Sequence, residues 1–379
     1  MRFAIFYLVL ALFILWRFIW PLTLSRLARG VIGALLLIPF LLELYLVSQG
    51  GLAAPEVPRL LLIAHNLLSV TLLLLGVFVL LREAIALLIA LVARRATTSP
   101  ARLRRDRRLA LGMTLASGAL SAFGVNRGIA VARVLERDMP IEALPTSLEG
   151  LTIVQISDVH ASSLLREPHM AAMVERVNAL NPDIIVVTGD VADGFVKRRE
   201  RDVAPLAKLR ARLGVFVCEG NHEHYVDYEH WVQTFPALGW RFLRNASETL
   251  LIQGTPLTIA GVTDPMAARF GRERPDPVEA FAEAPEEGVR ILLAHQPKYA
   301  RDYRERVRFD VQLSGHTHGG QILGMNKAIA VMNGGYVYGW YPLQGSAKLY
   351  VHSGTGLWNG FAVRLGVPSE IVRFTLRRA

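Results

Sequence analysis

The residues of this sequence that could do chemistry lie in five short blocks, each of which follows a short apolar run. The blocks contain aspartate, histidine and asparagine set among glycines, and they read Asp158-Val159-His160, Gly189-Asp190, Gly220-Asn221-His222-Glu223, His295 and Gly315-His316-Thr317-His318. Five of the ten histidines of the chain belong to these blocks. Glycines beside them allow the backbone to turn tightly and to approach a ligand closely. The pattern therefore indicates a ligand site rather than five unrelated surface turns.

The types of side chain in the blocks favour metal ions as the ligand. Carboxylate, amide and imidazole groups without a thiolate suit Mn, Fe or Zn, and they disfavour a structural thiolate zinc site. Two ions about 3.5–4 Å apart can hold both the attacking and the leaving oxygen of a phosphoryl displacement. Seven candidate ligands are too many for one ion, but they fit two ions if one carboxylate bridges them: Asp158, His160, Asp190, Asn221, His295, His316 and His318.

The elements that must position these blocks are short strands that alternate with helices. Apolar runs predict the strands that precede the five blocks, over residues 152–156, 184–187, 215–218, 291–294 and 311–313. Helical spacing predicts helices over 168–180 and 203–213, and weaker strands are expected over 250–252, 257–260, 349–351 and 371–376. This alternation favours a layered α/β architecture. The carboxyl ends of strands are the edge at which such sheets bind ligands.

The first third of the chain has a different composition, which is typical of membrane helices. The whole chain is 52% hydrophobic and 20% charged, which excludes a disordered chain, and its single cysteine, Cys218, excludes a disulfide-stapled mini-protein. A membrane-spanning helix needs about 17–25 apolar residues. We expect four transmembrane helices within residues 1–126, the first of them uncleaved, followed by a linker over 127–150 and an enzyme domain over 151–379. The expected helices cover residues 3–24, 31–47, 60–81 and 109–125, with 84–92 as an interfacial turn.

The distribution of positive charge predicts the orientation of these helices. Residues 1–150 contain 16 arginines and 8 acidic residues, and seven of the arginines lie within residues 94–108. Basic residues in short loops mark the cytoplasmic side of a membrane. The N-terminus and the residues beyond about 126 are then expected on the outer face. The domain would be cytoplasmic if residues 109–125 did not span. Because the domain itself carries a net charge of only +2, nucleic acid is not an expected partner.

Taken together, the five blocks resemble the signature of the calcineurin-like metallophosphoesterase family, over roughly residues 150–375. Residues that follow the last block are similar to the bacterial membrane-linked branch of that family: Gly319-Gly320-Gln321, Ser353-Gly354-Thr355-Gly356, Arg364 and Pro368-Ser369-Glu370-Ile371. The resemblance implies a β-sandwich flanked by helices, with a site for two metal ions at the edge of the sandwich.

The resemblance also implies a role for each residue of the blocks. Carried over to this sequence, Asp158, His160 and His318 would hold the first metal ion and Asp190 would bridge the two ions. Asn221, His295 and His316 would hold the second ion. His222 would be the catalytic histidine beside the leaving group, and Glu223 would orient it. Metal-activated hydroxide would attack phosphorus in line.

The expected function is therefore a membrane-anchored, metal-dependent phosphoesterase in the bacterial inner membrane, with its catalytic domain on the periplasmic face. Phosphodiester, phosphomonoester and pyrophosphate bonds are all candidate substrates, and membrane tethering favours lipid-linked or envelope phosphoesters, with membrane lipids as partners. One alternative is a hydrolase of the UDP-diacylglucosamine type, if the domain is cytoplasmic. Others are a non-catalytic, metal-dependent membrane sensor or scaffold, and transport through polar intramembrane residues: Arg17, Glu43, His65 and Asn66.

Overall fold

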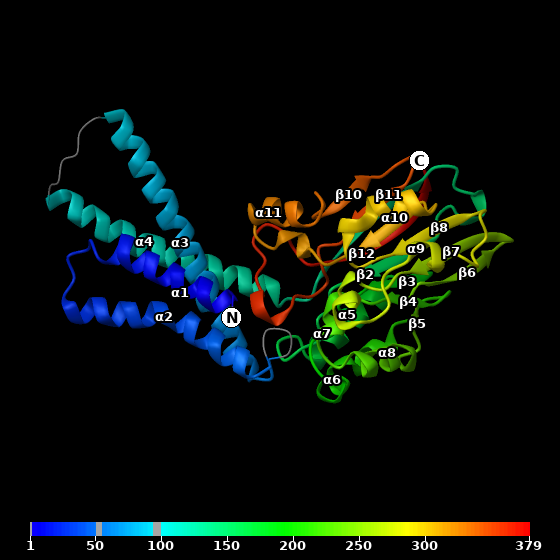
Figure 1. Ribbon diagram of the computed structural model, residues 1–379, viewed down its shortest axis with the longest axis horizontal. Coiled ribbons are helices and arrows are strands. Elements are labelled where there is room, and N and C mark those ends of the chain that lie inside the picture. The colour runs from blue at the N-terminus through cyan, green and yellow to red at the C-terminus, as the bar shows by residue number, and fades with distance from the viewer. Residues whose placement is uncertain (1, 51–54, 94–99) are drawn as a thin grey trace. The chain divides into compact units, whose positions relative to one another are not determined.

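The computed structural model describes residues 2–50, 55–93 and 100–379. It divides into two compact units, Met1–Arg127 and Gly128–Ala379. Figure 1 shows the helices of the first unit in blue and cyan and the strands of the second unit in green to red. The sequence predicts this division, because apolar helical segments are confined to the first third of the chain and strands to the remainder.

The N-terminal unit consists of helices α1 (Arg2–Ile14), α2 (Arg26–Ser48), α3 (Arg59–Ala93) and α4 (Pro100–Gly128). Residues 26–48, 59–89 and 108–128 are each long and apolar enough to cross a membrane, and residues 3–19 form a shorter apolar helix. This confirms the predicted group of N-terminal apolar helices. The first of them ends at Ile19 in a π-helical turn, instead of continuing to residue 24. Pro21 follows directly and has no N–H group to continue the helical hydrogen bonds, although Trp20 before it still has helical dihedral angles.

Two loops of the sequence interpretation differ in the structure. The segment 84–92, expected as an interfacial turn, is the continuation of α3, which runs without interruption to Ala93. No proline or glycine follows Gly76 in this helix, so nothing in the sequence ends it earlier. Of the arginine-rich loop over 94–108, residues 94–99 lie outside the described part of the chain, and residues 100–108 form the first turns of α4.

The polar residues expected within the membrane helices are mostly paired inside the first unit. Glu43 Oε2 lies 3.2 Å from His65 Nε2, and both side chains are buried. Ser69 Oγ lies 3.5 Å from the other ring nitrogen of His65, and the Asn66 amide donates to the Leu62 carbonyl of its own helix. Glu43 of α2 therefore pairs with a side chain of the neighbouring helix α3. Such contacts between helices are a common use of polar side chains in membrane bundles.

The second unit is a sandwich of two six-stranded sheets. In order across each sheet, the strands are β1-β12-β2-β3-β4-β5 and β10-β11-β9-β8-β7-β6. Their apolar side chains meet in one core, to which Ile184, Phe216 and Phe374 contribute from the first sheet and Ile291 and Leu313 from the second. The strands of the first sheet are Arg133–Ile141, Glu370–Arg378, Thr152–Ile156, Ile184–Thr188, Val215–Cys218 and Arg241–Phe242. Those of the second are Gly339–Pro342, Lys348–Val351, Val311–Ser314, Val289–Leu293, Thr255–Gly261 and Ala246–Ile252.

The predicted α/β sandwich flanked by helices is confirmed, with two local differences. Helix α5 (Glu167–Asn178) buries Met170, Met173 and Val177, as its spacing predicts. The helix expected over 203–213 is instead α6 (Val196–Val203) followed by a 3-10 turn over Ala204–Lys208. Residues 133–141, which the sequence interpretation assigns to the linker, form β1 and pair in parallel with β12. Pro140 lies in this strand at the edge of the sheet, where a missing N–H is tolerated.

Candidate metal centre

All five blocks lie at the carboxyl ends of strands, as the sequence predicts. Strands β2, β3 and β4 run parallel, so Asp158, Asp190 and Asn221 emerge at one edge of the first sheet. Strands β8 and β9 are also parallel, and His295 and His316 follow them in the second sheet. The His316 backbone N–H donates to Asp158 Oδ1 at 3.0 Å and so joins the loops of the two sheets. The Asp158 N–H donates to the Gly189 carbonyl at 3.0 Å and joins two neighbouring loops of the first sheet.

The backbone of these loops is held in an unusual conformation. Eleven non-glycine residues in the described part of the chain have a positive φ, and five of them belong to the blocks: Asp158, His160, Asp190, His316 and His318, at 48° to 70°. A left-handed conformation at a non-glycine residue costs about 1–3 kcal/mol and persists only where the surroundings impose it. Because this strained conformation occurs at five candidate ligands, we infer that the surrounding fold imposes the direction in which these side chains point.

Two glycines allow the loops to approach one another closely. A Cβ atom on Gly220 would collide with the backbone nitrogen and the carboxylate of Asp190, and one on Gly315 would collide with Ser157 and with the carboxylate of Asp158. These are the contacts that bring the third and fifth blocks against the first and second. The glycines that accompany the candidate ligands in the sequence are therefore required by packing at the site.

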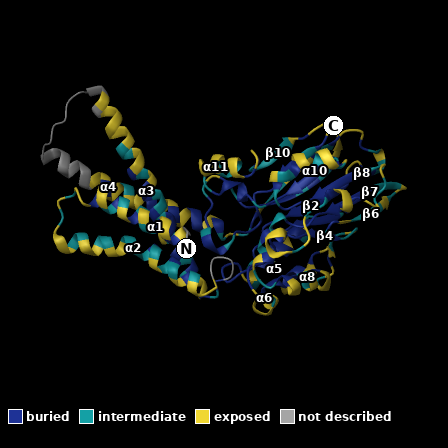
Figure 2. Cartoon of the chain, viewed as in Figure 1, coloured by how far each residue is buried: buried dark blue, intermediate teal, exposed yellow. Residues whose placement is uncertain are grey.

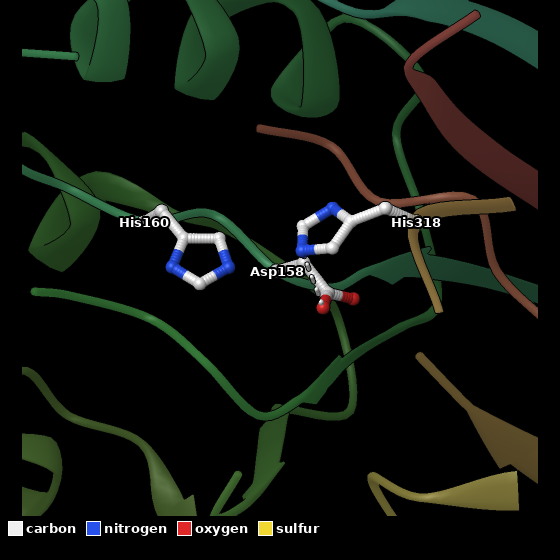
Figure 3. Close-up of side chains that lie close together, drawn as sticks. All are labelled: Asp158, His160 and His318. Atoms are coloured by element: carbon white, nitrogen blue, oxygen red, sulfur yellow. Dashed lines mark ion pairs between the residues drawn. The ribbon is translucent and has the colours of Figure 1, made fainter. Parts of the chain in front are cut away.

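The first group of candidate ligands consists of Asp158, His160 and His318. Each of them offers one ligand atom, and these atoms lie within 4.8 Å of one another. Figure 3 shows the three side chains close together and marks the ion pair between His318 and Asp158. His318 Nε2 lies 3.5 Å from Asp158 Oδ1. His160 Nε2 is buried and has no hydrogen-bond partner, while Nδ1 of the same ring lies 2.9 Å from Asp193 Oδ1. A buried nitrogen without a partner is the arrangement that a metal ion would satisfy.

The second group consists of Asn221, His295 and His316, and Asp190 lies between the two groups. Asn221 Oδ1 is 2.7 Å from His316 Nδ1 and 3.1 Å from His295 Nε2. Asp190 Oδ2 is 3.2 Å from His295 Nε2 and 3.7 Å from His160 Nε2. The structure thus brings all seven predicted ligands together, and it leaves none of them apart.

The pKa values of the two imidazoles of the last block suit metal binding, whereas the Asp190 carboxylate raises the pKa of His295 well above its usual value against the effect of burial. Burial lowers the pKa of His316 to about 3, and burial, together with the nearby His160, lowers the pKa of His318 well below its usual value. Neutral imidazole is the form that binds metal ions. Burial alone would raise the pKa of Asp190, but His295 and His222 hold it well below its usual value. Two neutral imidazoles and an ionised carboxylate are therefore available as ligands.

His222 lies beside the cluster with a different protonation state. Its Nε2 is 4.0 Å from Asp190 Oδ2, and its Nδ1 is 2.8 Å from Asp193 Oδ1. Burial would lower the pKa of His222, but the carboxylates of Asp190 and Asp193 raise it to about 9. At neutral pH the ring is thus an imidazolium, which cannot bind a metal ion but can donate a proton.

The expectation that Glu223 orients His222 is wrong. The Glu223 carboxylate accepts hydrogen bonds from the backbone N–H groups of Asp190, Val191 and Gly220, at 3.0, 2.7 and 2.7 Å, and so holds the second and third blocks together. Asp193 contacts His222 instead, and it also contacts His160. The sequence interpretation missed Asp193, although it lies only three residues beyond Asp190 in the same loop.

Arg364 holds the backbone of the loop that carries His318, a member of the first group. This buried arginine donates to the backbone carbonyls of His318 and Ser353 at 2.6 Å each, and to that of Gly356 at 3.2 Å. It thereby ties the loop of the last block to the segment that precedes β12. The sequence draws attention to Arg364 only through the resemblance of the tail, because an isolated arginine gives no sign of which carbonyls it will bind.

Comparison with known proteins assigns this site to a family. Residues 151–320 match the calcineurin-like phosphoesterase family. The chain is 32% identical over 267 residues to a transmembrane protein with metallophosphoesterase domain from Danio rerio, covering 69% of this chain and 61% of that protein. It is 33% identical over 302 residues to the protein of the same description from Bos taurus, with 76% and 68% coverage. An uncharacterized metallophosphoesterase of Helicobacter pylori is 32% identical over 268 residues, with 71% and 70% coverage.

Proposed function

Since the chain belongs to the calcineurin-like metallophosphoesterase family, we propose that it is a membrane-anchored enzyme that hydrolyses phosphoesters with two divalent metal ions. The observation that carries this proposal is the position of Asp190, whose carboxylate oxygen Oδ2 lies 3.2 Å from His295 Nε2 of one group of candidate ligands and 3.7 Å from His160 Nε2 of the other. Phosphodiesters, phosphomonoesters and pyrophosphates share the phosphoryl centre that such a site would act on. Lipid-linked or envelope phosphoesters are the substrates that we expect for a membrane-anchored form.

In this proposal the ligands divide into two sets. Asp158, His160 and His318 would hold one ion, Asn221, His295 and His316 would hold the other, and Asp190 would contribute its carboxylate to both. The donor set of oxygen and imidazole atoms fits Mn, Fe or Zn. When bound, the two ions would neutralise charge on the phosphoryl oxygens and lower the pKa of the attacking water. Asp193 fixes the orientation of the His160 ring through its Nδ1, which leaves Nε2 directed at the site.

His222 acts on the leaving group in this proposal. Its ring is only 13% exposed, lies at the edge of the ligand cluster and carries a proton at neutral pH. Proton donation to a leaving oxygen contributes about 10²–10⁴-fold to the rates of enzymes that use it. Asp193 is a positioning residue for this step, because it holds Nδ1 of the same ring and stabilises its positive charge.

We also propose that the helices within residues 1–126 anchor the protein in the cell membrane and that the catalytic domain, residues 151–379, is on the outer side. The side depends on one helix, because the arginine-rich segment 94–108 favours the cytoplasm and residues 108–128 are long and apolar enough to cross. A periplasmic reporter fused to the C-terminus of the full chain should be active in a bacterial host. Activity of a cytoplasmic reporter instead would favour the UDP-diacylglucosamine type of hydrolase.

Asp190→Asn should abolish turnover, since an amide cannot bridge two cations as a carboxylate does. The measurement is hydrolysis of aryl phosphomonoesters, aryl phosphodiesters and a pyrophosphate by the purified full-length protein with Mn, Fe or Zn. Asp138→Asn, which alters an exposed aspartate of β1, is the matched control and should retain activity. If the unaltered protein binds metal but hydrolyses none of these compounds, the enzyme assignment fails and a metal-dependent sensor or scaffold replaces it.

The rate should fall as pH rises through about 9, because the pKa of His222 is raised to about 9 and only the protonated ring can donate. Asp193→Asn removes one of the charges that raise this pKa, so the falling limb of the pH–rate profile should move to lower pH. His222→Ala should lower the rate by about 10²–10⁴-fold at neutral pH and remove the limb. A His222→Ala profile that keeps the limb in place would show that another group is the acid.

A further inference from the structure

An apolar surface segment follows the last metal block directly. Helix α11 (Met325–Met332) contains no buried residue, as Figure 2 shows by its yellow and teal colouring. With Leu323, it supplies four of the nine large apolar side chains that are exposed between residues 128 and 379: Leu323, Met325, Val331 and Met332. We refer to residues 323–332 as the apolar segment. Single exposed apolar residues are normal on protein surfaces, but a cluster of this kind marks an interaction site.

The apolar segment is firmly attached to the site, so its exposure belongs to the folded state. Gly320, two residues after His318, packs so closely on α11 that a Cβ atom there would collide with the Asn326 backbone. The Leu323 N–H donates to the Leu365 carbonyl at 2.8 Å, beside Arg364, which in turn holds the His318 carbonyl. The segment is thus fixed within a few residues of a candidate metal ligand.

The charge around the apolar segment indicates which kind of surface it contacts. No aspartate or glutamate occurs between Asp310 and Glu370, a run of 59 residues. Lys327 is exposed within α11, and the exposed Lys298 lies next to Gly334, just beyond the end of the helix. Apolar side chains flanked by lysine, with no acidic residue, fit the interfacial zone of a membrane with anionic lipids.

We propose that the apolar segment inserts into the lipid surface of the membrane and presents the metal centre to phosphoesters carried by lipids. A lipid surface is the partner that the chain itself favours for the apolar segment, because three of its helices are long and apolar enough to cross a membrane. The choice of lipid-borne phosphoesters rests on the proposed function, whereas the insertion does not. The two parts are therefore tested by separate experiments.

Insertion is tested by fluorescence on the full-length protein in lipid nanodiscs. Val331, which is 81% exposed, is changed to cysteine and labelled with a polarity-sensitive nitrobenzoxadiazole dye, and the buried native Cys218 does not compete. Leu251→Cys is the matched control, since Leu251 is 73% exposed on β6. Nitroxide-bearing lipids should quench the label at residue 331 and leave the label at 251 unquenched. Equal quenching at both positions, or a label at 331 that is equally shielded in detergent, would overturn the proposal.

The substrate class is tested with two aryl phosphodiesters, one with a hexadecyl chain that anchors it in the bilayer and one with a methyl group. Val331→Asp with Met332→Asp should lower hydrolysis of the anchored ester at least about tenfold, which corresponds to about 1.4 kcal/mol. Hydrolysis of the methyl ester should be unchanged, and Leu251→Asp should alter neither. Equal loss on both esters would overturn the lipid-substrate part. If the proposed function itself were wrong, neither ester would be hydrolysed by any variant, while quenching at residue 331 would remain.

Discussion

The buried carboxylate of Asp190 is the group on which the rest of the site depends. It is almost fully removed from water, and its oxygens face three imidazoles from three other loops and the backbone N–H of His222. An ionised carboxylate in such a place is stable only if cations or hydrogen-bond donors surround it. The neighbouring loops supply those donors, and the same arrangement is one that could hold metal ions.

The fold brings these loops together through ordinary features of α/β proteins. Parallel strands place the ends of several loops at one edge, and the sandwich brings two such edges side by side. Left-handed backbone at five candidate ligands and tight glycine contacts then aim the side chains. Strain at these positions is compatible with stability because Glu223 and Arg364 hold the loops by hydrogen bonds to their backbone.

The sequence predicts the elements of this site better than its supporting contacts. Runs of β-branched residues such as Ile184–Val187 identify buried strands, and the polar residues that follow them identify the candidate ligands. The role of Asp193 was not predicted, because nothing in the sequence shows whether Asp190 or Asp193 will contact Nδ1 of His222, which lies 29 residues beyond Asp193. Strand β1 was missed for a related reason: its partner, β12, lies more than 200 residues further along, and its exposed edge lacks the apolar pattern of a buried strand.

Under the proposed function, the apolar segment would give a reason for the second unit to share a chain with helices that are long and apolar enough to cross a membrane. Helices alone would keep the domain near the membrane, but they would not determine which of its surfaces meets the lipid. A rigid apolar helix next to the last block would fix that orientation and place the metal centre at the height of lipid headgroups. No acidic residue occurs from 311 to 369, the stretch that contains both the apolar segment and the candidate ligands His316 and His318. This absence of negative charge is consistent with the placement beside lipid headgroups.

The most direct measurement is anomalous X-ray diffraction from crystals of the protein grown with manganese or zinc, recorded at the absorption edge of the metal. The account predicts two peaks about 3.5–4 Å apart. One should lie among Asp158, His160 and His318 and the other among Asn221, His295 and His316, with Asp190 touching both. A single peak, or peaks bound elsewhere on the chain, would contradict the claim that these seven side chains form a centre for two metal ions.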